Sequence, residues 1–331
     1  MKKVKTFLLG FMIPFVFLIG FFAGTSQEGT PQQVSPIELI TKPLEKYSIP
    51  ALAKTDIPTG VLTIEPPLAE ESSFSTHLFS FEFSPNLSKE TKKTTGQINI
   101  PTGNGKHPVV LMLRGYVDQE IYKTGMGTSS AAKVFAQNGF VTVAPDFLGY
   151  GGGDSEASNV LESRFQTYVT AISLYNSINQ IDSWDGKNIF IWGHSNGGQV
   201  ALTLLEITGA TTPTTLWAPV SKPFPYSVLY YTDESEDKGK FLRAEIANFE
   251  KLYDADLYSV DNYFGQIIAP VQLHQGTADD AVPLDWSDTL AKKLEDLDIL
   301  YFKYSGADHN LRPSWNTVVQ RDLSFFAKNT I

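Results

Sequence analysis

The sequence predicts an α/β fold, in which a mostly parallel sheet carries helices on both faces. From residue 108 to the C-terminus, short apolar runs alternate with longer segments of helical spacing. Several of these runs, such as 108–115, are continuously apolar, which is typical of strands covered on both faces. The chain has 331 residues, 42% of them hydrophobic, so it is long enough to bury such a core. We therefore expect one large domain of alternating strands and helices.

The N-terminal region differs from this pattern. Three lysines stand within residues 2–5, and the run from Thr6 to Gln27 carries no charge. At about 1.5 Å of rise per residue, that run as a helix would reach the thickness of a bilayer core, about 30 Å. We predict a signal peptide or membrane anchor over residues 1–27, with the rest of the chain outside the cytoplasm. The pattern leaves open whether the segment is cleaved. The polar residues 28–50 are expected to form a linker, and residues 51–331 the folded domain.

The composition excludes several classes of function. Cysteine is absent, so disulfides, thiolate metal sites and cysteine nucleophiles are ruled out. The formal net charge is −10 and no basic cluster offsets it, so nucleic acid is not an expected partner. The aspartates at 254, 256 and 261 do not match a calcium-loop spacing. No metal or other cofactor is predicted.

The expected elements follow from the hydrophobic patterns and the turn residues that bound them. Strands are expected at 77–84, 96–101, 108–115, 140–147, 188–193, 214–219, 270–276 and 299–304. The first two of these are separated by the polar residues 89–93 and are expected to form a hairpin. Helices are expected at 129–139, 165–181, 197–209, 285–297 and 314–329.

Residues 221–265 interrupt the alternation. They hold a helical stretch at 241–253 and a cluster of aromatic residues, Phe224, Tyr226, Tyr230 and Tyr231. Because the segment follows the strand 214–219, it should emerge at the carboxyl edge of the sheet, where such folds bind ligands. We predict a lid whose aromatic side chains form a wall of the substrate site. The alternative is a surface excursion whose aromatic residues only pack on the sheet.

The nucleophile is predicted from the turn Gly193-His194-Ser195-Asn196-Gly197-Gly198. An abrupt turn from the strand 188–193 into the helix 197–209 would hold Ser195 in a strained conformation at its apex. Side chains two positions away would clash there, and glycine removes them. The main-chain amide of Asn196 would then point into an oxyanion hole at the helix N-terminus, while His194 points away from Ser195. The alternative is an ordinary glycine-rich turn.

A serine hydroxyl needs a base, and the base needs a carboxylate that orients it. Among the five histidines, His309 lies in the loop between the last strand and the last helix, where the base is expected. The acid is expected in the loop after the strand 270–276, which carries Asp279 and Asp280. The order serine, aspartate, histidine is that of the α/β-hydrolases. The spacing alone leaves the choice between the two aspartates open.

A second oxyanion donor is expected from the loop after the strand 108–115. Gly115 permits a tight turn, so the amide or the phenol of Tyr116 would face the oxyanion beside Asn196. The alternative for Tyr116 is a packed aromatic side chain. Arg114 is expected either to pair with a loop carboxylate or to lie on the surface.

Three motifs together resemble one known family. GHSNGG, HQGTADDAVP and GADHN are similar, in that order, to the catalytic motifs of the prolyl oligopeptidase family of serine hydrolases, and APDFLGYGGGD resembles a segment upstream of its nucleophile. The resemblance covers the chain from about residue 49. It implies an α/β-hydrolase fold and an enzyme that cleaves peptides. It also selects Asp279 as the acid, because the first aspartate of the pair has that role in the family. The chain departs from the family in lacking room for the β-propeller, in reading HQG for the usual His-Gly, and in reading Arg114-Gly115-Tyr116 for His-Gly-Gly.

These observations predict a serine hydrolase without cofactor, in which Ser195, Asp279 and His309 form the triad. The resemblance favours a peptidase that acts on short peptides, whereas the missing propeller equally suits a carboxylesterase acting on a small molecule. A third possibility is a catalytically inactive, anchored binding module. All three triad positions hold usable residues in the expected order, which argues against an inactive fold.

Overall fold

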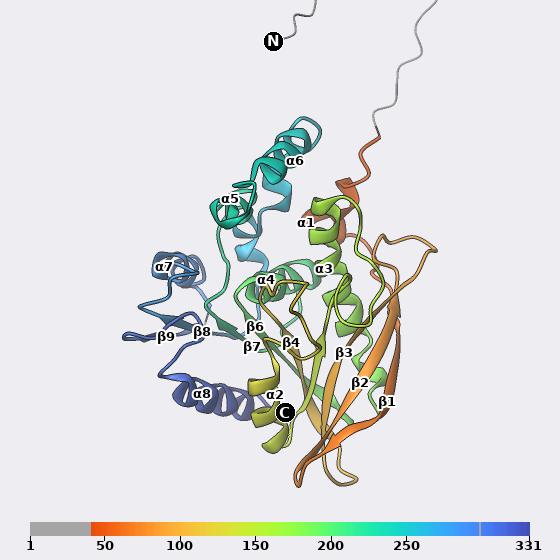
Figure 1. The fold of residues 1–331 in the computed structure, drawn as a ribbon. Helices are drawn as coiled ribbons and strands as arrows, with labels where there is room; N and C mark the ends of the chain where they lie inside the picture. The colour runs from red at the N-terminus through yellow and green to blue at the C-terminus, as the bar shows by residue number, and fades with distance from the viewer. Residues whose placement is uncertain (1–40, 298) are drawn as a thin grey trace, which may run out of the picture. The chain divides into compact units, whose positions relative to one another are not determined.

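The fold is built on a single sheet. The structure is a computed structural model that describes residues 41–297 and 299–331. Within these residues, nine strands pair in the order β1-β2-β3-β5-β4-β6-β7-β8-β9 (Figure 1). Their bounds are β1 Val61–Glu70, β2 Phe74–Phe83, β3 Lys92–Pro101, β4 His107–Leu113, β5 Val141–Pro145, β6 Trp184–His194, β7 Thr214–Trp217, β8 Val271–Gly276 and β9 Ile299–Tyr304.

The sheet has an antiparallel and a parallel part. β1, β2 and β3 pair antiparallel, and β3 joins β5 antiparallel as well. From β5 across to β9, every neighbouring pair is parallel. The predicted α/β fold with a mostly parallel sheet is therefore confirmed, and so is the hairpin, whose two strands are β2 and β3.

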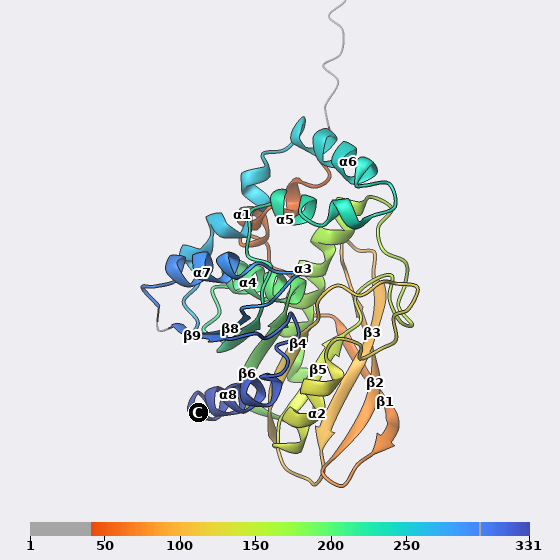
Figure 2. The same cartoon turned by 60° about the vertical axis from the view of Figure 1, so that its left-hand side comes forward.

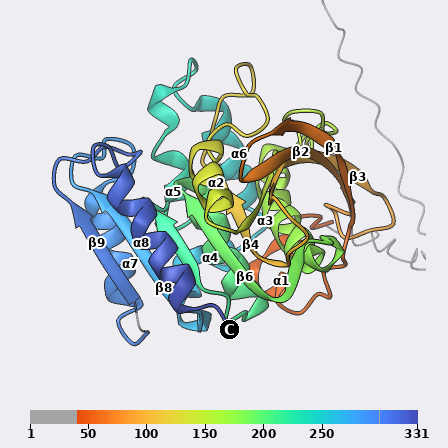
Figure 3. The same ribbon diagram turned by 90° about the horizontal axis from the view of Figure 1, so that it is seen from below.

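Helices cover both faces of the sheet. Their bounds are α1 Ile49–Leu52, α2 Ser129–Gln137, α3 Val160–Asn176, α4 Asn196–Thr208, α5 Tyr226–Leu229, α6 Lys240–Glu250, α7 Leu284–Lys293 and α8 Trp315–Lys328. The helices α3, α4 and α7 share one core cluster, through Phe165, Leu202 and Leu290. On the other face, α2 and α8 meet through Phe135 and Phe326, whose ring centroids are 5.4 Å apart (Figure 3).

Two elements begin where the sequence pattern did not indicate. Helix α3 starts at Val160, ahead of the predicted residue 165, because the Asn159 side chain accepts hydrogen bonds from the amides of Leu161 and Glu162. Strand β1 was not predicted at all. It contains Pro66 and Pro67, and its pairing with β2 is irregular there, which an edge strand tolerates.

The described chain is compact from Lys42 onward. The predicted linker extends to residue 50, yet Tyr47 and Ile49 are buried, and the Tyr47 hydroxyl lies 3.0 Å from a Glu162 carboxylate oxygen. The predicted N-terminal segment, residues 1–27, lies outside the described residues, as does most of the predicted linker. Among the helices that the structure does describe, none combines the length and the apolar character that crossing a bilayer requires.

The insertion after β7 forms α5, α6 and several short 3₁₀ turns. Figures 1 and 2 show α5 and α6 at the same end of the domain as α1. Hydrogen bonds join the two regions: the Tyr253 hydroxyl accepts from the Leu44 amide at 3.0 Å, and the Tyr258 hydroxyl donates to the Leu44 carbonyl at 2.9 Å. Ile246 and Phe249 of α6 are buried in the main core, so the insertion is packed onto the domain.

Candidate active site

Ser195 lies at the junction of β6 and α4 in a strained conformation. Its φ is +56° and its ψ is −122°, which L-residues rarely adopt. The neighbouring backbone is packed so closely that only glycine fits at 197, where an added Cβ would lie 1.9 Å from the Leu113 carbonyl oxygen. At Gly193 the corresponding Cβ would lie 2.8 Å from the Gly197 carbonyl oxygen. This packing fixes a sharp turn that presents the serine at its apex.

The structure brings His309 and Asp279 together. His309 lies in the loop between β9 and α8, and its Nδ1 is 2.9 Å from Oδ2 and 3.1 Å from Oδ1 of Asp279. The Asp279 side chain is fully buried, whereas the neighbouring Asp280 is exposed and has no hydrogen bond among the described residues. Of the two adjacent aspartates, only Asp279 therefore contacts His309.

The Asp279 carboxylate has further hydrogen-bond donors. Its Oδ1 accepts from the amides of Ala281 at 2.9 Å and Val282 at 2.8 Å, and its Oδ2 accepts from Nε2 of Gln275 at 3.0 Å. Burial by itself would raise the pKa of this carboxyl, but the hydrogen bonds from His309 and the two amides outweigh it. The pKa of Asp279 is therefore held below its usual value, and the group stays ionised beside the imidazole.

His194 contacts the same histidine from the other side. Its Nε2 lies 3.0 Å from the His309 carbonyl oxygen, and the two imidazole rings are 4.7 Å apart. Burial, with a smaller contribution from His309, lowers the pKa of His194 to about 4. A neutral His194 therefore donates its Nε2–H to that carbonyl. The turn motif by itself predicts no contact between His194 and His309. Side chains alternate along β6, and this pattern could have predicted that His194 lies on the same face of the sheet as Trp192.

The two expected oxyanion donors lie next to Ser195. Asn196 is the first residue of α4, and no hydrogen bond among the described residues uses its main-chain amide or that of Tyr116. The turn that carries Tyr116 passes directly against the serine, because a Cβ on Gly115 would lie 2.9 Å from the Ser195 Cβ. The Tyr116 side chain is 76% exposed and is therefore not a packed aromatic residue.

Arg114 supports the same turn from inside the protein. Its guanidinium donates to the carbonyl oxygens of Gly115 at 3.0 Å and Asp146 at 2.7 Å, and it lies over the rings of Tyr122 and Tyr150 at 4.5 and 4.1 Å. Its side chain is buried. Arg114 therefore neither pairs with a carboxylate nor lies on the surface, as the two sequence-based alternatives proposed. It holds the turn through main-chain oxygens and aromatic rings.

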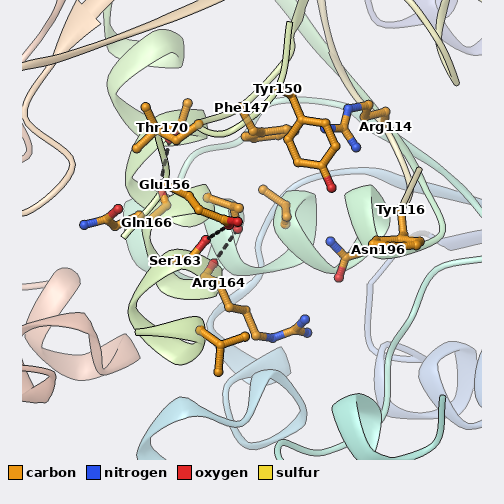
Figure 4. A pocket seen from close by; sticks show the side chains of 14 residues that line it. Arg114, Tyr116, Phe147, Tyr150, Glu156, Ser163, Arg164, Gln166, Thr170 and Asn196 are labelled. Atoms are coloured by element: carbon orange, nitrogen blue, oxygen red, sulfur yellow. Dashed lines mark hydrogen bonds between the residues drawn. The ribbon is translucent and has the colours of Figure 1, made fainter. Parts of the chain in front are cut away.

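A first cavity of about 170 Å³ opens beside Asn196 and Tyr116 (Figure 4). Its far wall is α3 with the loop that precedes it, and it carries both signs of charge. Glu156 accepts hydrogen bonds from Gln119 and Ser163, and Arg164 donates from Nη2 to Gln199 at 2.6 Å. The Nε–H of Arg164 is buried and has no partner among the described residues. The cavity therefore offers polar contacts to a bound group as well as apolar ones.

The predicted aromatic wall is divided by the structure. Tyr226, Tyr230 and Tyr231 gather around Trp286, with ring centroids 6.2, 4.9 and 6.3 Å from it. Tyr226 and Tyr230 remain 49% and 40% exposed. Phe224 is buried in the main core against the rings of Phe165, Phe249 and Tyr258, so it lies apart from the three tyrosines.

Comparison with known proteins places these features in a wider context. A model described as the prolyl oligopeptidase family matches residues 126–330. An uncharacterized peptidase, YtmA of Bacillus subtilis, is 28% identical over 243 residues, which are 72% of this chain and 89% of YtmA.

The solved structures that are similar include both esterases and peptidases. Acetyl xylan esterase 1 from Thermoanaerobacterium has a TM-score of 0.60 at 15% identity, over 86% of this chain and 93% of the esterase. Est1E from Butyrivibrio proteoclasticus, solved with ferulic acid, has a TM-score of 0.53 at 16% identity, over 72% of this chain and 95% of its own. A puromycin-hydrolyzing peptidase of Mycobacterium tuberculosis has a TM-score of 0.55 at 19% identity, over 81% of this chain and 39% of the peptidase. At these identities the likeness shows the α/β-hydrolase fold alone.

Proposed function

Because the chain belongs to the prolyl oligopeptidase family of α/β hydrolases, we propose that it is a serine peptidase that cleaves short peptides through an acyl-enzyme at Ser195. The observation that carries the proposal is the contact between His309 Nδ1 and the buried Asp279 carboxylate, at 2.9 Å, beside a strained serine. A buried carboxylate on Nδ1 leaves Nε2 of the imidazole free to accept a proton.

The proposed reaction has two halves. In the first, Ser195 Oγ attacks the scissile carbonyl while His309 Nε2 takes the hydroxyl proton. The amides of Asn196 and Tyr116 hold the oxyanion, and His309 returns the proton to the leaving amine. In the second half, His309 takes a proton from water, the hydroxide attacks the acyl-enzyme, and Ser195 recovers its proton as the acid leaves. Asp279 keeps the proton on Nδ1 throughout and stabilises the imidazolium that forms.

The structure contains no hydrogen bond between Ser195 Oγ and His309, both of which it describes. Such bonds are often long in free enzymes and shorten when substrate binds. Substrate binding is therefore expected to complete the contact.

The choice of a peptide is supported by the first cavity. Glu156 and Arg164 both line it, and the Arg164 Nε–H has no partner there among the described residues. These groups suit a chain with amide groups better than a plain aliphatic acyl group. The second candidate, a carboxylesterase, is favoured by acetyl xylan esterase 1, whose structure is matched over 93% of its length.

Two measurements test these proposals. A fluorophosphonate should label Ser195 in the folded protein and leave Ser195→Ala unlabelled; absence of labelling in folded wild-type protein would exclude the serine hydrolase mechanism. Hydrolysis of a peptide and of an ester with the same acyl group then separates the two activities. We expect the peptide to be cleaved, and cleavage of the ester alone would assign the protein as a carboxylesterase.

We also propose that residues 1–27 carry the protein out of the cytoplasm, as an anchor or as a cleaved signal, on the strength of the uncharged run from Thr6 to Gln27. Fractionation of cells that express the full chain should find it in the membrane or outside, accessible to added protease. Recovery of the intact chain in the cytoplasm would contradict this.

A further inference from the structure

A second cavity, of about 130 Å³, lies beside the loop that carries His309. The first turn of α2 lines it, and so do Asn310, Arg312 and Trp315 of the segment that follows His309. Trp192 and His194 of β6 also line it. No residue lines both this cavity and the first one, and no aspartate or glutamate is among the described residues that line it. The neighbouring Asp308 carboxylate accepts from the amides of Asn310 and Arg312 at 2.9 and 2.8 Å.

Hydrogen-bond donors without partners surround this cavity. Trp192 lines it with its side chain 1% exposed, and its indole Nε1–H is buried with no partner among the described residues. At the N-terminus of α2, Thr128 makes no side-chain cap, and no hydrogen bond within the described chain uses the amides of Ser130 and Ala131. Arg312 is exposed and forms no ion pair with any described residue. A helix N-terminus, an indole N–H and a guanidinium all favour an anion.

The second cavity lies on the side of His309 where the leaving group of the substrate is expected. His309 must pass its proton to the leaving atom, so that part of the substrate lies beside His309. The cavity is flanked by Asn310, the next residue, and by His194, which lies 3.0 Å from the His309 carbonyl oxygen. The first cavity is lined by Asn196 and Tyr116 and therefore lies on the side of the acyl group.

We propose that the second cavity binds the C-terminal carboxylate of the peptide fragment that leaves, so that the enzyme prefers short peptides with a free C-terminus close to the scissile bond. The inference rests on the proposed peptidase function and adds a substrate class to it. Arg312 supplies the charge at the mouth of the cavity, and the amides of α2 with the Trp192 indole supply directed donors deeper in it.

The test uses two peptides with the same acyl part, one ending in glycine with a free carboxylate and the other in glycinamide. For the full-length wild-type protein we expect kcat/KM to be about tenfold higher for the free acid, the size of one charge-assisted hydrogen bond. Arg312→Gln should lower this ratio severalfold toward one, because only the uncharged donors of α2 and Trp192 remain. Lys133→Gln is the matched control, because Lys133 is an exposed cation on α2 that does not line the cavity. It should leave the ratio unchanged.

A peptide that ends in an amide but carries an aspartate side chain distinguishes the two sources of a carboxylate. We expect it to behave like the glycinamide peptide, since the second cavity is proposed to bind the C-terminal carboxylate and not a side-chain carboxylate. Three results would overturn the proposal: a wild-type ratio near one, an equal loss in Lys133→Gln and Arg312→Gln, or a preference for the aspartate peptide. Fluorophosphonate labelling separates this from failure of the proposed function. A labelled enzyme with a ratio near one refutes only the role of the cavity, whereas an unlabelled enzyme refutes the hydrolase itself.

As a second readout, titration with N-acetylglycine should change tryptophan fluorescence, because three tryptophans, Trp192, Trp217 and Trp315, line the cavity. Trp192→Phe should weaken this binding without abolishing it, since the guanidinium remains. An unchanged fluorescence signal at millimolar concentrations would count against the site.

Discussion

Replacing Asp279 with asparagine should place the wrong tautomer on His309. In the structure, Asp279 Oδ1 accepts the amides of Ala281 and Val282 at 2.9 and 2.8 Å, while Oδ2 lies closest to His309 Nδ1, at 2.9 Å. An asparagine that keeps both amide bonds must put its own oxygen at the Oδ1 position, and it then loses the one bond that Oδ2 accepts from Gln275. Its NH₂ group then occupies the Oδ2 position and donates to His309 Nδ1.

This reversal moves the imidazole proton to Nε2, so Nε2 loses the lone pair that accepts the serine proton. The expected loss in kcat is about 10⁴-fold, as for the same change in other serine hydrolase triads. At 1.36 kcal/mol for each factor of ten, that loss corresponds to about 5.4 kcal/mol of transition-state stabilisation. KM should change little, because Asp279 lines neither cavity.

The assay is single-turnover acylation of Ser195 by an activated ester, together with the rate of fluorophosphonate labelling. Asp280→Asn is the matched control, since Asp280 is exposed beside Asp279, and its rates should stay within about twofold of wild type. Circular dichroism confirms that both variants are folded. A loss below tenfold in folded Asp279→Asn, or equal losses in the two variants, would refute the reasoning.

Three further outcomes are expected. Glu206 is buried with neither carboxylate oxygen hydrogen-bonded among the described residues, and burial, with a smaller effect of Asp261, raises its pKa well above 4.5. A carboxyl whose pKa is raised in the folded state destabilises the protein increasingly as the pH rises above the pKa of the same group in the unfolded state. Glu206→Met should therefore raise the free energy of unfolding, measured by urea denaturation, by about 1–3 kcal/mol at pH 8 and by less near pH 4. A difference that does not change with pH would contradict this. His194→Phe keeps a ring beside His309 but loses the hydrogen bond. With an activated ester whose leaving group carries no carboxylate, and so does not use the second cavity, kcat should fall about tenfold with KM unchanged and a parallel pH–rate profile above pH 5. An unchanged kcat would show that the bond has no positioning role. A double variant that carries Tyr226→Ala and Tyr230→Ala should alter the preference of the enzyme among acyl groups while Ser195 is still labelled by the fluorophosphonate. An unchanged preference in competition assays would mean that the insertion is not a lid.

Much of the fold could be predicted because it is recorded locally in the sequence. The parallel strands read as apolar runs, and glycines on both sides of Ser195 mark the sharp turn. The strand order alone predicts that the loops after β8 and β9 lie close together, because neighbouring parallel strands end at the same edge of the sheet. The loop that carries Asp279 and Asp280 is therefore expected to approach His309, whereas the choice of Asp279 over Asp280 comes from the family resemblance alone.

Other features depend on contacts between distant residues, which no local pattern contains. Strand β1 exists because it pairs with β2, although its two prolines argue against a strand. Phe224 and Tyr226 are two residues apart and belong to one aromatic cluster in the sequence, yet one is 3% and the other 49% exposed. The second cavity is likewise formed by four separate segments of the chain, so its donors are not neighbours in the sequence.

The unusual HQG sequence shows how a departure from the family pattern is accommodated. Because side chains alternate along β8, His274 and Gln275 point to opposite faces of the sheet. His274 is fully buried, 3.0 Å from an Asp322 carboxylate oxygen and 2.7 Å from the Tyr304 hydroxyl, and takes no part in the site. Gln275 faces the loop that carries Asp279, and its Nε2 donates to Asp279 Oδ2 at 3.0 Å. Its Oε1 accepts from the Ser287 hydroxyl at 2.7 Å. Gln275 thus gives the Asp279 carboxylate a buried hydrogen-bond donor that is itself held in place. This donor stabilises the ionised form of Asp279, which orients His309.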